Sequence, residues 1–436
     1  MNAIVPDKHG DWFNQRDDSF SHFMRMDGKK TKEVPIFKDY SLGVNTNRDA
    51  WVYNSSRQTV IDSIKRSIDA FNKAINDLFN GQDVAVTKQK YLKDVAWSSS
   101  LVSRLERKIT SVFSEDRLQE SLYRPFFKQN LYFDPDSGFT HRPGRWKYIF
   151  PATQIDNLVL CINQNAKDAG QIALMTDHIA DLHFNGDTQC FPRWLPGDQG
   201  KTEEDELDFG ESSELPSGFS PQALPHFQAA YPGKPINEDD LFYYIYGILH
   251  SEDYRTRYAN NLMKELPRIP RAATYEQFMA FVEAGQELAK VHVHFEDVKP
   301  YGGVTIEYTK SGQPSYRVKQ MKWGKIKGKT GNAAKDKTTL IYNDWITVKN
   351  IPLEAQEYVV NKKSALDWVV ERACVSIDKA SGIVNDFNDY ASEMGSERYP
   401  LDLFLKIIAV SLETMKIVRA LPKLEIHQLD KEASLD

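Results

Sequence analysis

The sequence predicts an α+β fold in which a helical segment precedes a mixed, largely antiparallel β domain and packed helices close the chain. Three observations predict it. Apolar residues recur at helical spacing after Asn54, short aromatic and β-branched runs with turn residues dominate from Leu122 onward, and a long apolar stretch of helical character follows Pro400. With 436 residues the chain is too long for one core, so we expect several subdomains.

The first third of the chain is predicted to be a short β segment followed by helices. Residues 34–54 favour strand, turn and strand, with Gly43 in the turn. Asn54, Ser55 or Ser56 can cap the next helix, and Gly81 stands where its C-terminal cap belongs. A second helix is predicted around 97–113. We therefore expect an opening segment over 1–54 and a helical spacer over 55–121.

A β-rich domain is predicted over 122–360. Short buried strands are expected at 157–163 and 172–176, and the dipeptide Asn185-Gly186 predicts a β-hairpin across 175–194. The acidic, Ser/Gly/Pro-rich stretch near 197–237 predicts a mobile surface insertion.

Alternating helices and strands are expected after that insertion. Helices are predicted at 241–250, after the capping residue Ser251, and through 274–290, where Thr274 and Gln277 form a capping-box pattern. A β-meander is expected over 304–350, with 304–309 and 316–323 flanking one turn. The part over 361–436 is predicted to be helical.

Composition excludes several classes of protein. The three cysteines fit neither a disulfide framework nor a paired zinc motif, which favours a reducing cytoplasm. No run of about eighteen apolar residues offers a membrane span. The net charge of −6 argues against a uniformly basic nucleic-acid binder, but its placement is uneven. Residues 203–214 hold seven acids, whereas 317–337 hold seven Lys and Arg317 against Asp336 alone.

Two clusters resemble metal sites. In the hairpin predicted for MTDHIADLHFNGDTQCFPRW, His178 and His183 point to opposite faces of a strand, and no Cys-x-x-Cys completes a zinc site. The simpler interpretation is that the polar residues of this stretch, including Cys190 and the neighbouring aspartates, lie on the surface of the hairpin. His292 and His294 with Glu296 share a face only if that segment is extended. We expect no metal at either place.

Catalytic motifs are weak. The chain has no Gly-x-Ser-x-Gly elbow, no Walker-type loop and no Gly-x-Gly-x-x-Gly. Glu106-Arg107-Lys108 with Asp94 upstream fits a nuclease pattern, but such triplets are common in amphipathic helices.

Two basic segments are better leads. The first, a Gly-punctuated loop expected between two strands, carries Trp323 and can reach a phosphate backbone, although charge runs are often only solvated. Its lysines are Lys319, Lys322, Lys325, Lys327, Lys329, Lys335 and Lys337. The second holds Arg142, Arg145, Trp146 and Lys147 in a Pro-Gly setting, and Arg is the residue best matched to guanine edges.

Seven blocks of the sequence together resemble the C-terminal target-recognition part of type ISP single-polypeptide restriction-modification enzymes. They run in the family's order from about residue 8 to residue 421. The blocks are LGVNTNRDAWVYN, LYRPFFKQNLYFD, MTDHIADLHFNGDTQCFPRW, FYYIYGILHSEDYRTRYANNLMKELPRIP, VVNKKSALDWVVER, SGIVNDFND and YPLDLFLKII.

The resemblance implies sequence-specific recognition of double-stranded DNA, with adenine-N6 methylation and translocation-coupled cleavage performed by other domains. Those nuclease, helicase and methyltransferase portions, with their S-adenosylmethionine, ATP and Mg, have no motif in this sequence, so we expect no cofactor here. We expect instead a recognition part, either a fragment or a separately encoded subunit. Residues 1–54 would then be a methyltransferase junction, in which Thr46 and Arg48 either face DNA or shape a turn.

The resemblance and the charge pattern give a set of expected DNA contacts. Base-reading and loop residues are Arg142, Arg145, Lys147, Lys325, Lys327, Lys329, Gln189 and Arg193. Expected phosphate contacts, each of which can equally be an internal salt bridge, are Arg124, Lys128, Arg255 and Arg257. Two other functions stay open: a catalytic nuclease or methyltransferase fragment with an undetected site, and a protein-interaction scaffold, favoured by the acidic insertion.

Overall fold

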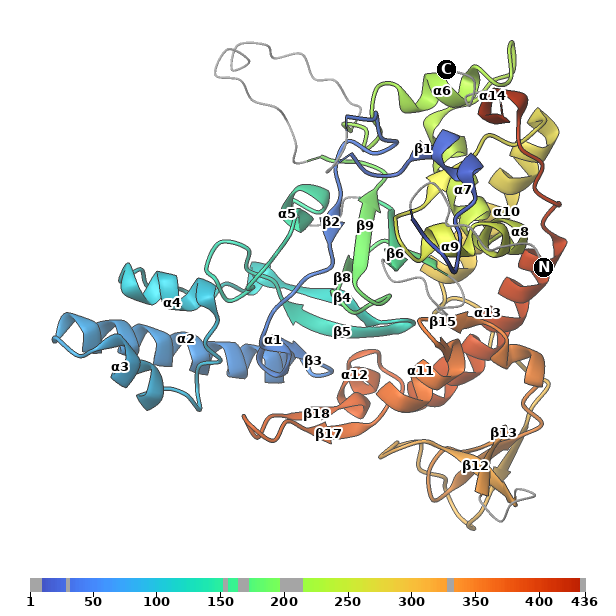
Figure 1. Cartoon of the computed structure of the whole chain (residues 1–436). Coiled ribbons are helices and arrows are strands. Elements are labelled where there is room, and N and C mark those ends of the chain that lie inside the picture. The colour runs from blue at the N-terminus through green and yellow to red at the C-terminus, as the bar shows by residue number, and fades with distance from the viewer. Residues whose placement is uncertain are drawn as a thin grey trace.

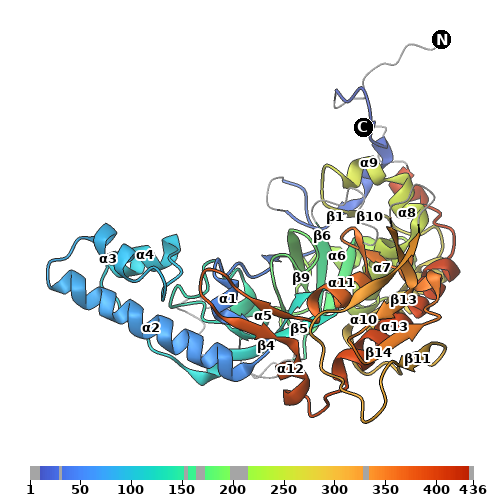
Figure 2. The ribbon, with the colours of Figure 1, turned by 90° about the horizontal axis from the view of Figure 1, so that it is seen from below.

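The fold is a mixed α+β arrangement, as predicted (Figure 1). The computed structural model describes residues 10–28, 32–151, 156–163, 172–196, 215–327 and 333–431. Sheets form the centre, a helical arm projects from one side, and further helices cover the other side (Figure 1 and Figure 2). None of the helices in these ranges has the length and apolar character needed to cross a membrane.

The arm follows five short elements of the described chain and contains the longest of the described helices. Ser56 caps this helix by accepting a hydrogen bond from the Thr59 amide, and Gly81 follows its end with φ +87°. The helix predicted around 97–113 ends at Glu106, earlier than predicted, because Lys108 adopts φ +54°. The elements up to this point are η1 (Asp18–His22), β1 (Met24–Arg25), β2 (Ser41–Leu42), α1 (Asp49–Val52), β3 (Tyr53–Asn54), α2 (Arg57–Phe79), α3 (Val84–Lys90) and α4 (Ser99–Glu106).

Two four-stranded sheets form the centre. One has the order β3-β5-β4-β8, and in it β4 and β5 form an antiparallel hairpin while β8 runs parallel to β4. The other has the order β2-β9-β6-β7 and is antiparallel throughout. The bounds are η2 (Glu115–Arg117), β4 (Leu118–Arg124), β5 (Phe127–Tyr132), α5 (Trp146–Ile149), β6 (Val159–Asn163), β7 (Ala173–Thr176), β8 (Ile179–Ala180) and β9 (Thr188–Pro192).

The sheet β2-β9-β6-β7 separates two hydrophobic cores. Along β6, Val159 and Cys161 face one core, whereas Leu160 and Ile162 face the other. A strand buried on both faces favours consecutive apolar residues, which explains the apolar run over 159–162 in the sequence. The predicted strands at 157–163 and 172–176 are therefore confirmed as β6 and β7.

The predicted hairpin across 175–194 is wrong. A turn does occur at Asn185 and Gly186, where Gly186 has φ +76°, but β8 and β9 belong to different sheets. Asn185 is buried, and its side-chain amide donates to the carbonyl oxygens of Cys161 and Ile172 at 3.3 and 3.1 Å. The turn therefore anchors the chain as it passes from one sheet to the other.

Helices fill the second core. Residues 197–214 of the predicted acidic insertion lie outside the described residues. For 215–237 the prediction of a mobile surface insertion is wrong, because Phe219, Ala223 and Phe227 are buried in the second core. The predicted caps Ser251 and Thr274 accept amide hydrogen bonds as expected. The elements are α6 (Ala223–Gln228), α7 (Glu238–His250), α8 (Glu252–Arg257), α9 (Ala259–Leu262), β10 (Arg268–Ile269) and α10 (Tyr275–Val293).

Helices α7 and α10 cross at two glycines. A Cβ at Gly285 would overlap the carbonyl oxygen of Tyr243, and one at Gly247 would overlap that of Phe281. We expect Gly285→Val to lower the free energy of unfolding by at least about 1–3 kcal/mol, because the backbones must separate. Urea unfolding checks this, with Gly302→Val as a control, because nothing lies within 4 Å of a Cβ at Gly302 and its φ is not positive. Equal losses at the two positions would contradict close packing as the cause.

Two buried histidines lie where α10 meets its neighbours. The condition under which His292 and His294 would share a face, an extended segment, is not met, because His292 lies in α10 and its ring contacts the hydroxyls of Tyr246 and Thr414. His250, in α7, is fully buried, and its Nδ1 donates to the carbonyl oxygen of Tyr246. Burial lowers the pKa of His250 to about 4 and lowers that of His292 well below its usual value.

This burial predicts a loss of stability in acid. Between pH 6.5 and 4 the unfolded chain binds a proton at His250 that the folded chain does not, so the free energy of unfolding falls as the pH falls through this window. The expected contribution is about 3 kcal/mol, complete below about pH 4. Urea unfolding from pH 7 to pH 4 measures it. His250→Leu should flatten this dependence, and an equally steep dependence in the variant would contradict the assignment.

The third sheet has the order β11-β14-β13-β12 and lies at the lower edge of Figure 1. The prediction that 304–309 and 316–323 form a hairpin is wrong, because β11 pairs with β14. The predicted lysine-rich loop is mostly a two-stranded hairpin, since β12 and β13 extend into it. The bounds are β11 (Thr305–Tyr308), β12 (Lys322–Lys327), β13 (Ala333–Ile341) and β14 (Ile346–Lys349).

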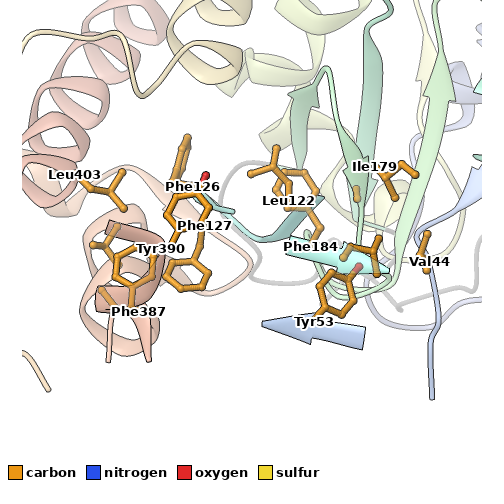
Figure 3. Packing of buried hydrophobic residues seen from close by; sticks show 14 of the residues in the cluster. Val44, Tyr53, Leu122, Phe126, Phe127, Ile179, Phe184, Phe387, Tyr390 and Leu403 are labelled. Carbon is orange, nitrogen blue, oxygen red and sulfur yellow. The ribbon is translucent and has the colours of Figure 1, made fainter. Parts of the chain in front are cut away.

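The C-terminal helices close the first core. Figure 3 shows Phe387 and Tyr390 of α12 and Leu403 of α13 beside Phe126 and Phe127 of the central hairpin. The long apolar stretch is helix α13, buried on most sides as predicted. The elements are η4 (Leu353–Gln356), β15 (Val359–Val360), β16 (Lys363–Ser364), α11 (Ala365–Arg372), β17 (Val375–Ile377), β18 (Val384–Asp386), α12 (Phe387–Glu393), α13 (Tyr399–Ala420) and α14 (Gln428–Lys431).

Candidate nucleic-acid interface

Three segments that are far apart in the sequence meet at one pocket. The backbone amides of Asn45 and Arg142 donate to each other's carbonyl oxygens, at 3.2 and 2.8 Å. On the other side, the amide of Val44 donates to Ala180 and that of Leu182 donates to Val44, both at 2.9 Å. Two loops singled out by the sequence and the first half of MTDHIADLHFNGDTQCFPRW therefore lie side by side.

We call this hollow, of about 470 Å³, the central pocket. Most of its lining residues belong to the segment from Val44 to Trp51, which comprises the loop before helix α1 and most of α1 itself, and the tip of the β17–β18 hairpin closes one side. Its lining residues are Val44, Asn45, Thr46, Asn47, Arg48, Asp49, Ala50, Trp51, Ala96, Asp181, Leu182, His183, Asp378 and Ala380.

Hydrogen bonds fix the loop from Asn45 to Asp49. The Asn45 side-chain oxygen accepts from the amide of Asn47, which adopts φ +54°, a conformation that asparagine tolerates well. Thr46 donates to the carboxylate of Asp49, and the hydroxyl of Tyr123 donates to the same carboxylate at 3.1 Å. Thr46 thus shapes the turn and is buried, whereas Asn47 is exposed at its tip.

Below the pocket, an internal ion pair replaces one expected phosphate contact. Arg124 is buried, with its Nη1 2.6 Å from the carboxylate of Asp181 and its guanidinium over the ring of Tyr123. Burial raises the pKa of Asp181 to about 6, although Arg124 acts in the opposite direction. Asp181 also accepts from the His183 amide at 2.9 Å, so it braces the wall that carries the exposed ring of His183.

The loop of Arg142, Arg145 and Lys147 keeps an exposed basic side. Arg142 is exposed beside Asn45 at the rim of the central pocket. Arg145 pairs with Asp39 at 2.8 Å, and Lys147 is 3.5 Å from Asp136.

The lysine-rich segment forms a second basic surface, which we call the basic hairpin and define as β12 with β13. Lys325 stands directly opposite Lys335, and Lys322 is exposed on the same strand as Lys325. A groove of about 590 Å³ between this hairpin and α11 is lined by these three lysines and by Lys363. The strand β12 includes Lys327, but its side chain and the whole of Lys329 lie outside the described residues.

Trp323 anchors the basic hairpin rather than presenting a stacking surface. It is 7% exposed, its Nε1 donates to Asp367 at 2.7 Å, and its ring packs against Phe404. Lys337 lies over the same ring and pairs with Asp367. Lys337 of the lysine-rich segment therefore forms an ion pair within the fold.

Two residues expected to read bases are internal. Gln189 is 3% exposed in β9, between Leu42 and Ile162 of the neighbouring strands. Arg193 is 5% exposed and binds Glu238 and Asp239 at 2.9 and 2.7 Å. Because these acids begin helix α7, Arg193 fastens that helix to the sheet, and we remove both residues from the expected DNA contacts.

The remaining expected phosphate contacts are also engaged. Lys128 is half-buried and lies 2.7 Å from Glu296, which ties β5 to the loop after α10. Arg257 is half-exposed and lies 3.2 Å from Asp17. Arg255 is half-buried on α8, where burial lowers the pKa of its guanidinium. Lys128 and Arg257 therefore form salt bridges within the fold, which was the stated alternative to a phosphate contact.

The residues that the sequence offers for metal or nuclease chemistry do not come together in one site. Within the described ranges, no group of three or more His, Cys, Asp or Glu side chains is arranged to hold a metal ion. His178 bonds Asp177 and lies 3.5 Å from Glu120, whereas His183 faces the central pocket. Asp94 lies 3.7 Å from Arg66 on helix α2, which is a surface ion pair.

Sequence reasoning missed the β17–β18 hairpin as part of this surface. Its tip brings Asp378 and Ala380 to the central pocket, and Ile377 and Val384 on its strands are 63% and 46% exposed. Figure 1 shows this hairpin and the basic hairpin along the same lower edge. The block SGIVNDFND contains part of it, so the family resemblance was the signal that could have found it.

Comparison with known proteins shows which family this chain resembles. The family model described as the type ISP C-terminal specificity domain matches residues 35–403. The ATP-dependent type ISP restriction-modification enzyme LlaBIII bound to DNA is 30% identical, with a TM-score of 0.81 over 97% of this chain and 26% of that one. No curated protein matches the sequence.

Two further solved structures are similar. A nuclease-deletion mutant of the type ISP enzyme LlaGI, in complex with a DNA substrate mimic, is 32% identical, with a TM-score of 0.78 over 97% of this chain and 36% of that one. A DrdV–DNA complex is 26% identical, with the same TM-score over 98% of this chain and 41% of that one. This chain therefore spans less than half the length of each of these enzymes, and it belongs to the family of type ISP C-terminal specificity domains.

Proposed function

We propose that this chain recognises a specific sequence in double-stranded DNA as the specificity domain of a type ISP restriction-modification enzyme. The observation that carries the proposal is the similarity along 97–98% of the chain to enzymes whose structures are DNA complexes. In this proposal, adenine-N6 methylation and translocation-coupled cleavage belong to other portions of the same enzyme, which bind S-adenosylmethionine, ATP and Mg.

The rim of the central pocket has side chains suited to reading base edges. An arginine matches the two acceptors of guanine, and an asparagine amide matches the donor and acceptor of adenine. Arg142 and Asn47 are both exposed there, on backbone segments held by hydrogen bonds. A fixed backbone limits where these side chains reach, which is what discrimination between bases requires.

The basic hairpin supports binding to the phosphate backbone. Like charges directly opposite each other in an antiparallel pair destabilise a sheet, and Lys325 and Lys335 form such a pair. A polyanion along the hairpin would relieve this repulsion. Phosphate contacts hold a protein in register on the duplex while base contacts select the sequence, so the two surfaces have complementary roles.

Selection from a random duplex pool tests the proposal. The purified chain should enrich one short sequence, and a labelled duplex carrying it should bind more tightly than a scrambled duplex at every salt concentration. Affinity should fall as salt rises, because phosphate contacts release counterions. A chain that retains no duplex even at low salt, or that enriches nothing, would overturn the proposal.

A further inference from the structure

Arg48 is buried without an acidic partner. It is 5% exposed, and its Nη2 donates to the hydroxyl of Ser98 at 2.6 Å. Its Nε and Nη1 are buried and have no hydrogen-bond partner. The guanidinium carbon lies 5.5 Å from the ring of Phe139, and burial lowers the pKa of this guanidinium to about 10.

The other buried arginines of the described ranges are different. Arg124 pairs with Asp181, Arg193 with two acids at the start of α7, Arg268 with Glu33, and Arg271 with Asp430, all with at least one contact of 2.8 Å or less. A buried cation without an anion is unfavourable, because desolvation is not offset by attraction. This fold satisfies that requirement at four arginines and leaves it unmet at Arg48.

Arg48 lines the central pocket, where the nearby acids are engaged elsewhere. Asp49 accepts hydrogen bonds from Thr46 and Tyr123, and Asp181 pairs with Arg124. The third acid, Asp378, accepts from the amide and the hydroxyl of Ser381 within its own hairpin.

We propose that the central pocket holds one phosphodiester group of the bound DNA and that this phosphate is the missing anionic partner of Arg48. The inference rests on the proposed function and adds to it a particular ligand group at a particular residue. A guanidinium donates strong, charge-assisted hydrogen bonds to phosphate, and the Nε and Nη1 of Arg48, which lie on different edges of the guanidinium, each supply one donor without a partner. Asn47 and Arg142 at the rim would then stand beside a fixed point on the DNA backbone.

Arg48→Met tests the proposal through two readouts that move in opposite directions. Without DNA, the melting temperature should stay the same or rise, because an uncompensated buried charge is removed. Affinity for the selected duplex at low salt should fall roughly tenfold, and the slope of log K against log salt should lose about 0.9. Arg48→Lys keeps the charge and should keep most of the slope.

Arg104→Met is a matched control from the same part of the fold. Arg104, on α4, donates to the carbonyl oxygen of Thr110 and to the hydroxyl of Ser111, which are also neutral partners, but it does not line the central pocket. Arg104→Met should lower the melting temperature and leave the slope of log K against log salt unchanged.

The outcomes separate this proposal from the proposed function. If the unaltered chain binds duplex with a salt-dependent affinity but Arg48→Met keeps the same slope, the phosphate site is wrong and DNA recognition stands. A clear drop in melting temperature for Arg48→Met would likewise overturn the site, because it would show that the arginine is already compensated. If the unaltered chain binds no duplex, the proposed function itself is wrong.

Discussion

Replacing Arg124 by Met is expected to lower the free energy of unfolding by about 3–5 kcal/mol, because it leaves the Asp181 carboxylate buried without a partner. The same change should weaken discrimination between the selected and scrambled duplexes, since Asp181 braces the wall of the central pocket through the His183 amide. Urea unfolding and duplex competition measure the two effects.

The pH dependence of this variant provides a second check. Burial already raises the pKa of Asp181 to about 6, and removing Arg124 removes an influence that lowers it. In the variant, Asp181 can therefore become neutral by taking up a proton, so the loss of stability should be larger at pH 8 than at pH 5. An equal loss at both values would contradict the ion pair as the cause.

Two further variants control for packing and for surface charge. Arg124→Met combined with Asp181→Leu should recover much of the lost stability, because an apolar pair replaces the ion pair. Arg257→Met removes a half-exposed arginine that pairs with Asp17, and should cost no more than about 1 kcal/mol.

Replacing Lys322, Lys325 and Lys335 together by Ala is expected to weaken duplex binding and to flatten its salt dependence by up to about three units of slope. Each lysine that neutralises a phosphate contributes slightly less than one unit. Stability without DNA should not fall, since the change removes the repulsion between Lys325 and Lys335. Fluorescence anisotropy over a salt series measures the slope.

A matched triple variant distinguishes local contact from loss of net charge. Lys234, Lys416 and Lys423 are exposed residues that lie after α6, late in α13 and after α13. Their replacement by Ala changes the net charge by the same amount and should leave the slope almost unchanged. Equal flattening in both triple variants would remove the basic hairpin from the interface.

Local signals predicted much of the fold. Ser56, Ser251 and Thr274 cap helices as expected, because a capping side chain acts within a few residues of itself. The doubly buried strand β6 was equally visible, since burial on both faces favours the unbroken apolar run that it contains over 159–162. The pairing of β8 and β9 with different sheets was not predictable in this way, because it depends on partners that are distant in the sequence.

The candidate site was harder to predict for a related reason. An arginine that binds phosphate and one that pairs with an internal acid look alike in a sequence. The partners of Arg124 and Arg193 lie 57 and about 45 positions away, and only the folded chain brings them together. Arg142 stayed exposed because its loop pairs with Asn45 through backbone atoms alone.

The described residues before helix α2 are joined to the rest of the fold through strand pairs. Strand β1 pairs with β10, β2 is an edge strand beside β9, and Phe20 and Phe23 lie in the second core. An engineer who wishes to transfer specificity between such enzymes would therefore have to exchange this opening segment together with the sheets it joins. A chimaera cut between residues 54 and 122 would combine strands and cores from two different parents, and its new recognition loops would stand on a mismatched support.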